Sequence, residues 1–285
     1  MKPGETKMKN KPYLLFDAGG TLVFPDQGFL VEIAREYDIE LNDTQLFNGY
    51  YSLIHNLDRQ ANKYGYFSRN PWPNGYTYSL LRTIGVQEPK ARIIGEIANR
   101  RHEVKSLWTF TFSWVYEILT YLKDEGYRMS VISNSDGRIG QVLKDLALDR
   151  YFEEVFASGT LGVEKTDAAI YEIALDRLKI SPIDALYIGD VFTVDIKGAN
   201  LVGMGAIHID PLGLYASCPG VHLENITCLG RWLPIYENYA EFLLTKFFPY
   251  KMDSNLLLLE KYRIYSLSTG NTFVAYSTPS SSLGR

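Results

Sequence analysis

The sequence predicts an α/β fold, namely a Rossmann-like parallel sheet with helices on both faces and an inserted all-α cap domain. From about residue 113 onward, segments with helical periodicity alternate with short apolar runs, a rhythm typical of a parallel sheet covered on both faces. Another short apolar strand, residues 13–16, comes near the start, and a block of helical segments over 28–105 separates it from the rest. Because the first strand belongs with the later sheet, the helical block is an insertion.

The individual elements follow from the spacing of apolar residues, which recur every three to four positions in helices and form short runs in buried strands. Strand patterns are nearly absent from the inserted block. Helices are expected over 29–37, 44–57, 76–84 and 91–104 in that block, and over 113–126, 139–148, 167–178 and 193–203 after it. Strands are expected over 13–16, 128–133, 153–158, 185–189 and 206–210.

These elements divide the chain into three parts. The core domain comprises residues 11–24 and 113–233, and the helical cap comprises 25–112. Residues 234–285 form a C-terminal extension of unknown role. Its patterns predict a helix over 236–248, a hairpin within 262–277 and a disordered end over 277–285.

Composition and charge exclude several classes of function. The 285 residues are 46% hydrophobic and 22% charged, and 29 basic against 33 acidic residues give a net charge of −4. That balance offers no general electrostatic attraction for nucleic acid or for an anionic membrane surface. The start of the sequence contains no apolar stretch long enough for a signal peptide or a membrane span. We therefore expect a cytoplasmic protein that holds a small anionic ligand by local groups.

Cysteine and histidine show no familiar motif. The residues concerned are Cys218 and Cys228, and His55, His102, His208 and His222. The cysteines are not spaced like a zinc site or a redox pair, and in a reducing compartment both are expected as free thiols. The histidines are scattered, which argues against a zinc enzyme.

Chemically active residues stand where the predicted strands end. Asp17 follows the first strand and opens a glycine loop, Ser133 ends a second strand and Asp190 follows a third. Ligands of open parallel sheets bind at the carboxyl ends of the strands, and adjacent glycines let the backbone approach a ligand closely. We therefore expect a site at this edge, with Lys165 and Asp195 close by.

Each of these residues has a chemical role and an ordinary alternative. A carboxylate such as Asp17 can attack phosphorus and split hydrolysis into two displacements, but an aspartate also suits a turn. Magnesium prefers oxygen ligands and needs only one or two carboxylates, here Asp17 and Asp190. Lys165 would neutralise phosphoryl oxygens, although a loop lysine is usually solvated. Asp195 would orient metal-bound water or Lys165, or else stabilise a helix N-terminus.

Together, four segments resemble the motifs of the haloacid dehalogenase-like (HAD) hydrolase superfamily, subfamily I, with a helical C1-type cap. DAGGTL resembles the first motif, VISNSDG the second, VEKTDAAIY the third and GDVFTVDIKGA the fourth, and their order and spacing agree. The resemblance covers residues 11–233. It implies a Mg²⁺-dependent phosphatase that acts on a small phosphorylated or otherwise anionic substrate through an aspartyl-phosphate on Asp17.

The same resemblance assigns roles to residues of this sequence. The catalytic residues implied are Asp17, Ser133 and Lys165. The groups that bind the phosphoryl oxygens are those of Ser133, Asn134 and Lys165. The metal ligands are Asp17, Gly19 through its backbone carbonyl, and Asp190. Asp195 supports the metal or the lysine, and Thr21 is expected to form a hydrogen bond within the loop.

One residue departs from the motif. Phosphatases of this superfamily carry a second aspartate two positions after the nucleophile, where this sequence has Gly19. The glycine keeps a carbonyl for the metal but removes the general acid, which is worth roughly 10²- to 10⁴-fold in rate. Three interpretations follow: a phosphatase with another acid or with good leaving groups, a dehalogenase- or phosphonatase-like hydrolase, or a catalytically weak binding protein. The acidic fourth motif favours the metal-dependent phosphatase, because dehalogenases need no magnesium.

Substrate choice and oligomeric state stay open at this stage. The cap and the loop over 62–75 would set the substrate, and this loop resembles nothing that identifies one. Trp72 and the tyrosines of the loop would either stack on a base or sugar ring or pack the cap against the core.

Overall fold

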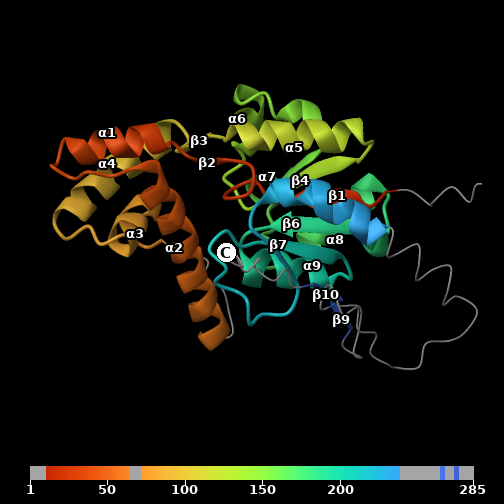
Figure 1. Ribbon diagram of the computed structural model, residues 1–285. Helices are drawn as coiled ribbons and strands as arrows, with labels where there is room; N and C mark the ends of the chain where they lie inside the picture. The colour runs from red at the N-terminus through yellow and green to blue at the C-terminus, as the bar shows by residue number, and fades with distance from the viewer. Residues whose placement is uncertain (1–10, 65–71, 238–263, 267–272, 276–285) are drawn as a thin grey trace, which may run out of the picture.

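The computed structural model describes residues 11–64, 72–237, 264–266 and 273–275 (Figure 1). Six parallel strands form one sheet in the order β5-β4-β1-β6-β7-β8. Their bounds are β1 Tyr13–Phe16, β4 Met129–Ser133, β5 Val155–Ala157, β6 Ala185–Gly189, β7 Gly205–Ile209 and β8 Val221–Leu223. The predicted α/β fold is confirmed. Strand β8 was not predicted, because three residues are too few to show a pattern.

Helices cover both faces of this sheet, and the alternation along β1 shows why. Leu14 and Phe16 pack in one cluster with α5 (Ser113–Asp124) and α6 (Ile139–Asp145). Tyr13 and Leu15 point to the other face, into a cluster with α8 (Ala169–Leu178) and α9 (Lys197–Leu201). Figure 1 shows α5 and α6 above the sheet and α8 and α9 below it. Since successive side chains of a strand face opposite sides, a strand buried on both sides is apolar throughout.

The described residues of the cap, 25–64 and 72–112, form four helices between β1 and α5. They are α1 Gln27–Arg35, α2 Asp43–Tyr64, α3 Tyr76–Thr83 and α4 Lys90–Val104. Their apolar stripes meet in two clusters, one around Leu30, Leu46 and Leu80 and one around Leu81 and Ile94. The inserted all-α cap of the predicted fold is therefore present, and it lies beside the sheet in Figure 1.

A short antiparallel ribbon joins the cap to the core. Strand β2 (Phe24–Pro25) pairs with β3 (Trp108–Phe110), so the two chain crossings between the domains lie side by side. The sequence did not predict this ribbon, because strands of two and three residues leave no periodicity. At its cap end, Arg101 contacts Asp26 at 2.6 Å, and Asp26 caps α1 by accepting a hydrogen bond from the Phe29 amide.

Two further regions differ from, or extend, the predicted elements. The helix expected over 193–203 divides into a π-helix, η3 (Phe192–Ile196), and α9. Strands β9 (Ile264–Ser266) and β10 (Phe273–Ala275) pair antiparallel, which confirms the hairpin expected in the C-terminal extension. The expected helix over 236–248, apart from residues 236–237, and the expected disordered end lie outside the described residues. Within the described ranges, no helix combines the length and apolar character needed to span a bilayer.

A buried aspartate of the cap fastens α2 to the core. The Asp58 carboxylate accepts hydrogen bonds from the backbone amides of Phe192 and Thr193, at 2.9 and 2.8 Å, and from the Tyr215 hydroxyl at 2.5 Å. It also bonds to the Thr193 hydroxyl. Because Phe192 and Thr193 open η3, this cap residue holds the helix that carries Asp195.

We predict that Asp58→Ala lowers the free energy of unfolding by about 3 kcal/mol, because a buried polar group left without a partner costs about 1–3 kcal/mol. Thermal and urea unfolding of the full chain measure this loss. Glu96→Ala removes an exposed acid from α4 and is the matched control. Equal stability of the two variants would show that Asp58 does not hold the domains together.

Candidate active site

The carboxyl ends of the central strands bring the predicted residues together. Asp17 follows β1, Asp190 follows β6, and Asp195 lies in η3. One carboxylate oxygen from each of these three lies within 4.8 Å of the others. The Asp17 amide donates to the Ile188 carbonyl at 2.7 Å, which ties the end of β1 to that of β6. The expected convergence of Asp17 and Asp190 is therefore present.

Lys165 forms the centre of a buried charge cluster. It comes from the loop after α7 (Ser158–Leu161), and its ammonium group pairs with Asp17 Oδ1 and, at 2.8 Å, with Asp195 Oδ1. Only 3% of the Lys165 side chain is exposed. Burial alone would lower the pKa of this lysine, but the two carboxylates outweigh burial and hold the pKa above its usual value. Lys165 is therefore a fixed positive charge in this site.

Two further hydrogen bonds fix Asp195. Its Oδ2 accepts the backbone amide of Val191 at 2.9 Å, and its Oδ1 lies 3.3 Å from the Tyr187 hydroxyl. Gly189 makes room for this carboxylate, since a Cβ there would lie 2.5 Å from Asp195 Oδ2. Asp195 thus orients the lysine, which is one of the two roles expected for it.

The charges in this cluster do not balance. Three buried carboxylates, those of Asp17, Asp190 and Asp195, face the one ammonium group of Lys165. Burial and the negative neighbour Asp195 raise the pKa of Asp17 to about 7, although Lys165 lowers it. Burial and the charges of Asp17 and Asp195 raise the pKa of Asp190. With all three carboxylates ionised, two negative charges would lack a counter-charge, and one divalent cation would supply it.

An unpaired oxygen points to the same conclusion. Among the residues that the structure describes, Asp190 Oδ1 is buried and has no hydrogen-bond partner. Buried polar atoms are nearly always bonded, so an exception calls for a ligand or an ion. A set of carboxylate and carbonyl oxygens suits magnesium, and the residues present therefore fit this metal.

The cap contributes two tyrosines that the sequence did not mark. The Tyr50 hydroxyl lies 2.8 Å from Asp190 Oδ2 and 3.3 Å from the Gly19 carbonyl oxygen, and Tyr51 donates to the Gly20 carbonyl at 2.6 Å. Both tyrosines lie on the buried side of α2, where aromatic residues usually serve packing alone. The sequence offered no local signal for these contacts, because they join residues about 30 and 140 positions apart.

The glycine loop after Asp17 is fitted closely to these groups. Gly20 has φ +79°, and a Cβ on it would lie 2.2 Å from the Tyr50 hydroxyl and 2.4 Å from Asp190 Oδ2. Only glycine both adopts this left-handed backbone readily and lacks the Cβ for which there is no room. At Gly19 a Cβ would meet the Trp108 ring at 3.3 Å, so the indole covers the position where the motif normally has its second aspartate.

Thr21 forms the hydrogen bond expected within the loop through its backbone, because its amide donates to the Ala18 carbonyl at 3.4 Å. Its buried hydroxyl has no hydrogen-bond partner within the described part of the chain. Backbone groups close the loop instead. The amides of Leu22 and Val23 both donate to the Ala18 carbonyl at 2.8 Å, and the Gly20 amide donates to the Val23 carbonyl at 2.9 Å.

Ser133 and Asn134 stand at the end of β4, beside the charge cluster. Ser133 is buried and lines the same cavity as Asp17 and Lys165. The Asn134 side chain accepts the backbone amide of Lys165 at 2.8 Å. Asn134 therefore has a structural role that the sequence did not predict, since it fixes the loop that presents the lysine.

Above these residues lies a cavity of about 610 Å³ between core and cap. Its cap wall is largely aromatic and includes Tyr50, Trp72, Tyr76 and Trp108. Trp72 also packs edge-on against Tyr76, with ring centroids 5.8 Å apart. Trp72 therefore packs within the cap and lines the cavity, and its stacking on a ring of the substrate stays a prediction.

The core wall of the cavity adds a cation that the sequence did not single out. Arg138 pairs with Asp136, and its Nη1 donates to the backbone carbonyl of His102 in the cap at 2.8 Å. All three residues line the cavity. Arg138 therefore links the two domains and adds positive charge beside the opening.

Comparison with known proteins identifies the family to which this fold belongs. Residues 13–203 match the model of the haloacid dehalogenase-like hydrolases, and the chain belongs to this family of hydrolases.

Two relatives and one solved structure illustrate the similarity. The glyceraldehyde 3-phosphate phosphatase of Pyrococcus furiosus is 28% identical over 244 residues, which cover 84% of this chain and 91% of that protein. A protein of the same name from Methanopyrus kandleri is 30% identical over 131 residues, so the match spans 46% of this chain and only 56% of that relative. The magnesium-bound structure of YfnB from Bacillus subtilis superposes with a TM-score of 0.55 at 20% identity, covering 79% of this chain and 99% of that one, which shows the shared fold.

We predict that Lys165→Met lowers the free energy of unfolding by about 3–5 kcal/mol in metal-free buffer, since removing one partner of a buried ion pair leaves an uncompensated charge. Urea unfolding at neutral pH measures the loss. The control is Lys197→Met, because Lys197 is exposed and hydrogen-bonds to Asn62 at the surface rather than to a buried carboxylate. If both variants lose the same small amount, Lys165 does not balance the buried carboxylates.

Proposed function

We propose that the protein is a magnesium-dependent phosphatase that hydrolyses a small phosphorylated substrate through an aspartyl-phosphate on Asp17. The observation that carries this proposal is the unbalanced cluster of three buried carboxylates and one lysine at the floor of the cavity. The names of the two similar phosphatases support a small phosphorylated substrate but not a stabilised leaving group, because glyceraldehyde 3-phosphate is an alkyl phosphate.

The metal would be held by Asp17, Asp190 and the Gly19 carbonyl. Magnesium supplies a positive charge that neutralises the phosphoryl oxygens as charge moves between the attacking and leaving oxygens. Tyr50 positions two of these ligands, because its hydroxyl contacts both Asp190 and the Gly19 carbonyl. Ser133 and the Asn134 amide would bind the remaining phosphoryl oxygens, together with Lys165.

The reaction consists of two successive displacements at phosphorus, and residues of this chain take part in both. In the first, Asp17 Oδ2 attacks phosphorus while Oδ1 stays paired with Lys165, and the bond from phosphorus to the leaving oxygen breaks. The leaving group departs as its anion. In the second, water attacks the same phosphorus and the bond to Asp17 breaks, which restores the carboxylate and leaves both protons of the water on the phosphate. Neither step uses a side chain at position 19.

The glycine at position 19 narrows the substrate class. Without a general acid, a leaving group must depart unprotonated, and that is easy for an acyl, enol or aryl phosphate and slow for an alkyl phosphate. The aromatic wall of the cavity would accept such a flat apolar group. We therefore propose phosphate compounds with stabilised leaving groups as the preferred substrates.

We predict that the purified full chain hydrolyses an aryl or acyl phosphate with magnesium, and that a chelator stops the reaction. Asp17→Asn lowers the rate by at least roughly 10³-fold, as expected for loss of a nucleophile. A panel of phosphate esters assayed with magnesium and with chelator measures both effects, with circular dichroism as the control for folding.

Other outcomes of the panel would change the assignment. An unchanged rate for Asp17→Asn would end its role as nucleophile. Release of chloride from 2-chloropropionate without metal would favour a dehalogenase, and cleavage of a carbon–phosphorus bond would favour a phosphonatase. Metal-dependent binding with no turnover on any substrate would indicate a binding protein.

We predict further that Gly19→Asp restores activity on alkyl phosphates only when Trp108 is reduced as well. The indole lies 3.3 Å from the position of the new Cβ, so Trp108→Val makes room for the carboxyl group. The double variant should exceed Trp108→Val by roughly 10²-fold or more in kcat/KM on an alkyl phosphate. A full gain from Gly19→Asp alone would show that Trp108 does not block this position, and no gain in either would show that another group already supplies the proton.

A further inference from the structure

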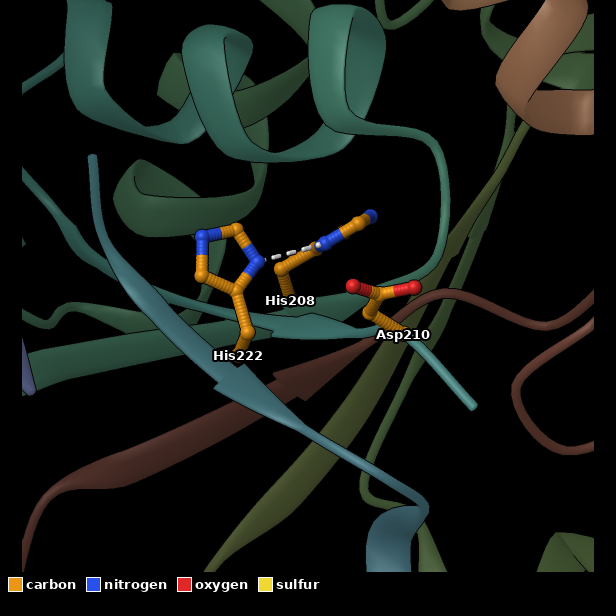
Figure 2. Close-up of side chains that lie close together, drawn as sticks. All are labelled: His208, Asp210 and His222. Carbon is orange, nitrogen blue, oxygen red and sulfur yellow. Dashed lines mark hydrogen bonds between the residues drawn. The ribbon is translucent and has the colours of Figure 1, made fainter. Parts of the chain in front are cut away.

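Two histidines and an aspartate meet at the edge of the sheet, away from the charge cluster. His208 in β7 stands opposite His222 in β8, and Asp210 directly follows β7. Figure 2 shows the two imidazole rings facing one another with the Asp210 carboxylate beside them. The Nδ1 atoms of the rings are 2.9 Å apart, and a carboxylate oxygen of Asp210 lies within 4.8 Å of a nitrogen of each ring.

Backbone carbonyls determine which ring nitrogens carry hydrogen. His208 Nε2 lies 3.0 Å from the Asp190 carbonyl oxygen, and His222 Nε2 lies 3.1 Å from the Cys218 carbonyl oxygen. A carbonyl oxygen can only accept a hydrogen bond, so both Nε2 atoms are donors. A neutral imidazole with a hydrogen on Nε2 has a bare lone pair on Nδ1. With both rings in this form, two lone pairs face each other where Figure 2 draws the hydrogen bond between the Nδ1 atoms, and no hydrogen is left to form that bond.

Lone pairs at this separation need a positive charge between them. Either one ring carries a second proton, or a metal ion binds both nitrogens. The neutral imidazole is the form that binds metals, and the carbonyl partners of both Nε2 atoms leave each Nδ1 atom available as a ligand.

We propose that His208, His222 and Asp210 form a second metal site, which takes a divalent transition metal of the zinc class. Imidazole nitrogen and carboxylate oxygen are typical zinc ligands, whereas magnesium prefers oxygen alone. An ion about 2.05 Å from both nitrogens would subtend about 90° at their present spacing, and a small opening of the pair reaches the tetrahedral angle. Three protein ligands leave one position for water.

The surroundings already orient the three ligands. Metal-binding histidines usually donate their other ring N–H to a carbonyl or carboxylate, and both rings do so here. The Asp210 carboxylate accepts the backbone amides of Leu214 and Tyr215, at 3.0 and 2.9 Å, and each oxygen keeps a lone pair for a metal. The site therefore needs little rearrangement to bind an ion.

The metal would act on the structure and, through one bond, on the active site. It would join the short edge strand β8 to β7 and to the loop after Asp210. The bound metal would fix the ring of His208. The Nε2 atom of this ring is hydrogen-bonded to the backbone carbonyl of Asp190. Occupancy of this site would therefore stabilise the loop that carries Asp190 without contacting the substrate.

Zinc binding to the full chain tests the proposal. The protein is titrated with Zn²⁺ in millimolar Mg²⁺, which occupies the carboxylate site, and bound zinc is counted by equilibrium dialysis and metal analysis. We expect one equivalent of zinc and a higher melting temperature. His222→Gln should weaken zinc binding by at least roughly 10-fold, as should Asp210→Asn. His55→Gln is the matched control, because His55 contacts Tyr215 but is not one of the three ligands.

Three results would overturn the proposal. One is the absence of a zinc equivalent in folded wild-type protein. Another is binding that survives His222→Gln and Asp210→Asn but is lost in Asp17→Asn, which would place the zinc at the carboxylate cluster. The last is a ¹⁵N NMR spectrum in which an Nδ1 is protonated at neutral pH and zinc leaves that proton in place, which would assign the charge between the rings to a shared proton.

Discussion

The paired ammonium group of Lys165 is the interaction on which the rest of the site depends. It pairs with the carboxylates of Asp17 and Asp195 in the interior, where an unpaired carboxylate is costly. The strands set this arrangement, since β1 delivers Asp17 and η3 follows β6 with Asp195. The lysine loop is held in turn by Asn134 at the end of β4. Three adjacent strands of the sheet thus fix one charged group.

The cap is part of this arrangement, because it does more than cover the cavity. Tyr50 contacts Asp190, and Asp58 binds the backbone at the start of η3, so helix α2 reaches two of the segments that carry site carboxylates. A movement of α2 would change hydrogen bonds at Asp190 and the position of η3 together. The contact between core and cap, which bounds the cavity, therefore also organises the carboxylates.

Much of the fold and part of the site could be predicted from sequence. What could be predicted depends on local patterns, whereas what could not depends on contacts between distant residues. Buried strands and amphipathic helices show in local periodicity, and the rule that ligands bind at strand ends predicts that Asp17 and Asp190 converge. Tyr50 and Trp108 could not be found in this way, because their roles come from contacts across the domain boundary. The same holds for His208 and His222, which become neighbours only because β8 pairs with β7. The motif predicted a hydrogen bond of Thr21 within the loop, but not that the backbone amide rather than the hydroxyl would form it.

The energetics of the cluster also bear on whether Gly19 marks a decayed enzyme. Buried ion pairs contribute little net stability, and well-packed apolar residues in their place are often neutral or stabilising. A fold that had lost its chemistry would gain nothing from three buried carboxylates or from an unpaired oxygen on Asp190. It would also gain nothing from a glycine at position 20, where the left-handed backbone and the Tyr50 and Asp190 side chains exclude every other residue. The whole arrangement is intact except at position 19, and there Trp108 fills the space of the absent side chain. This combination argues for a change in the leaving group rather than for the loss of catalysis.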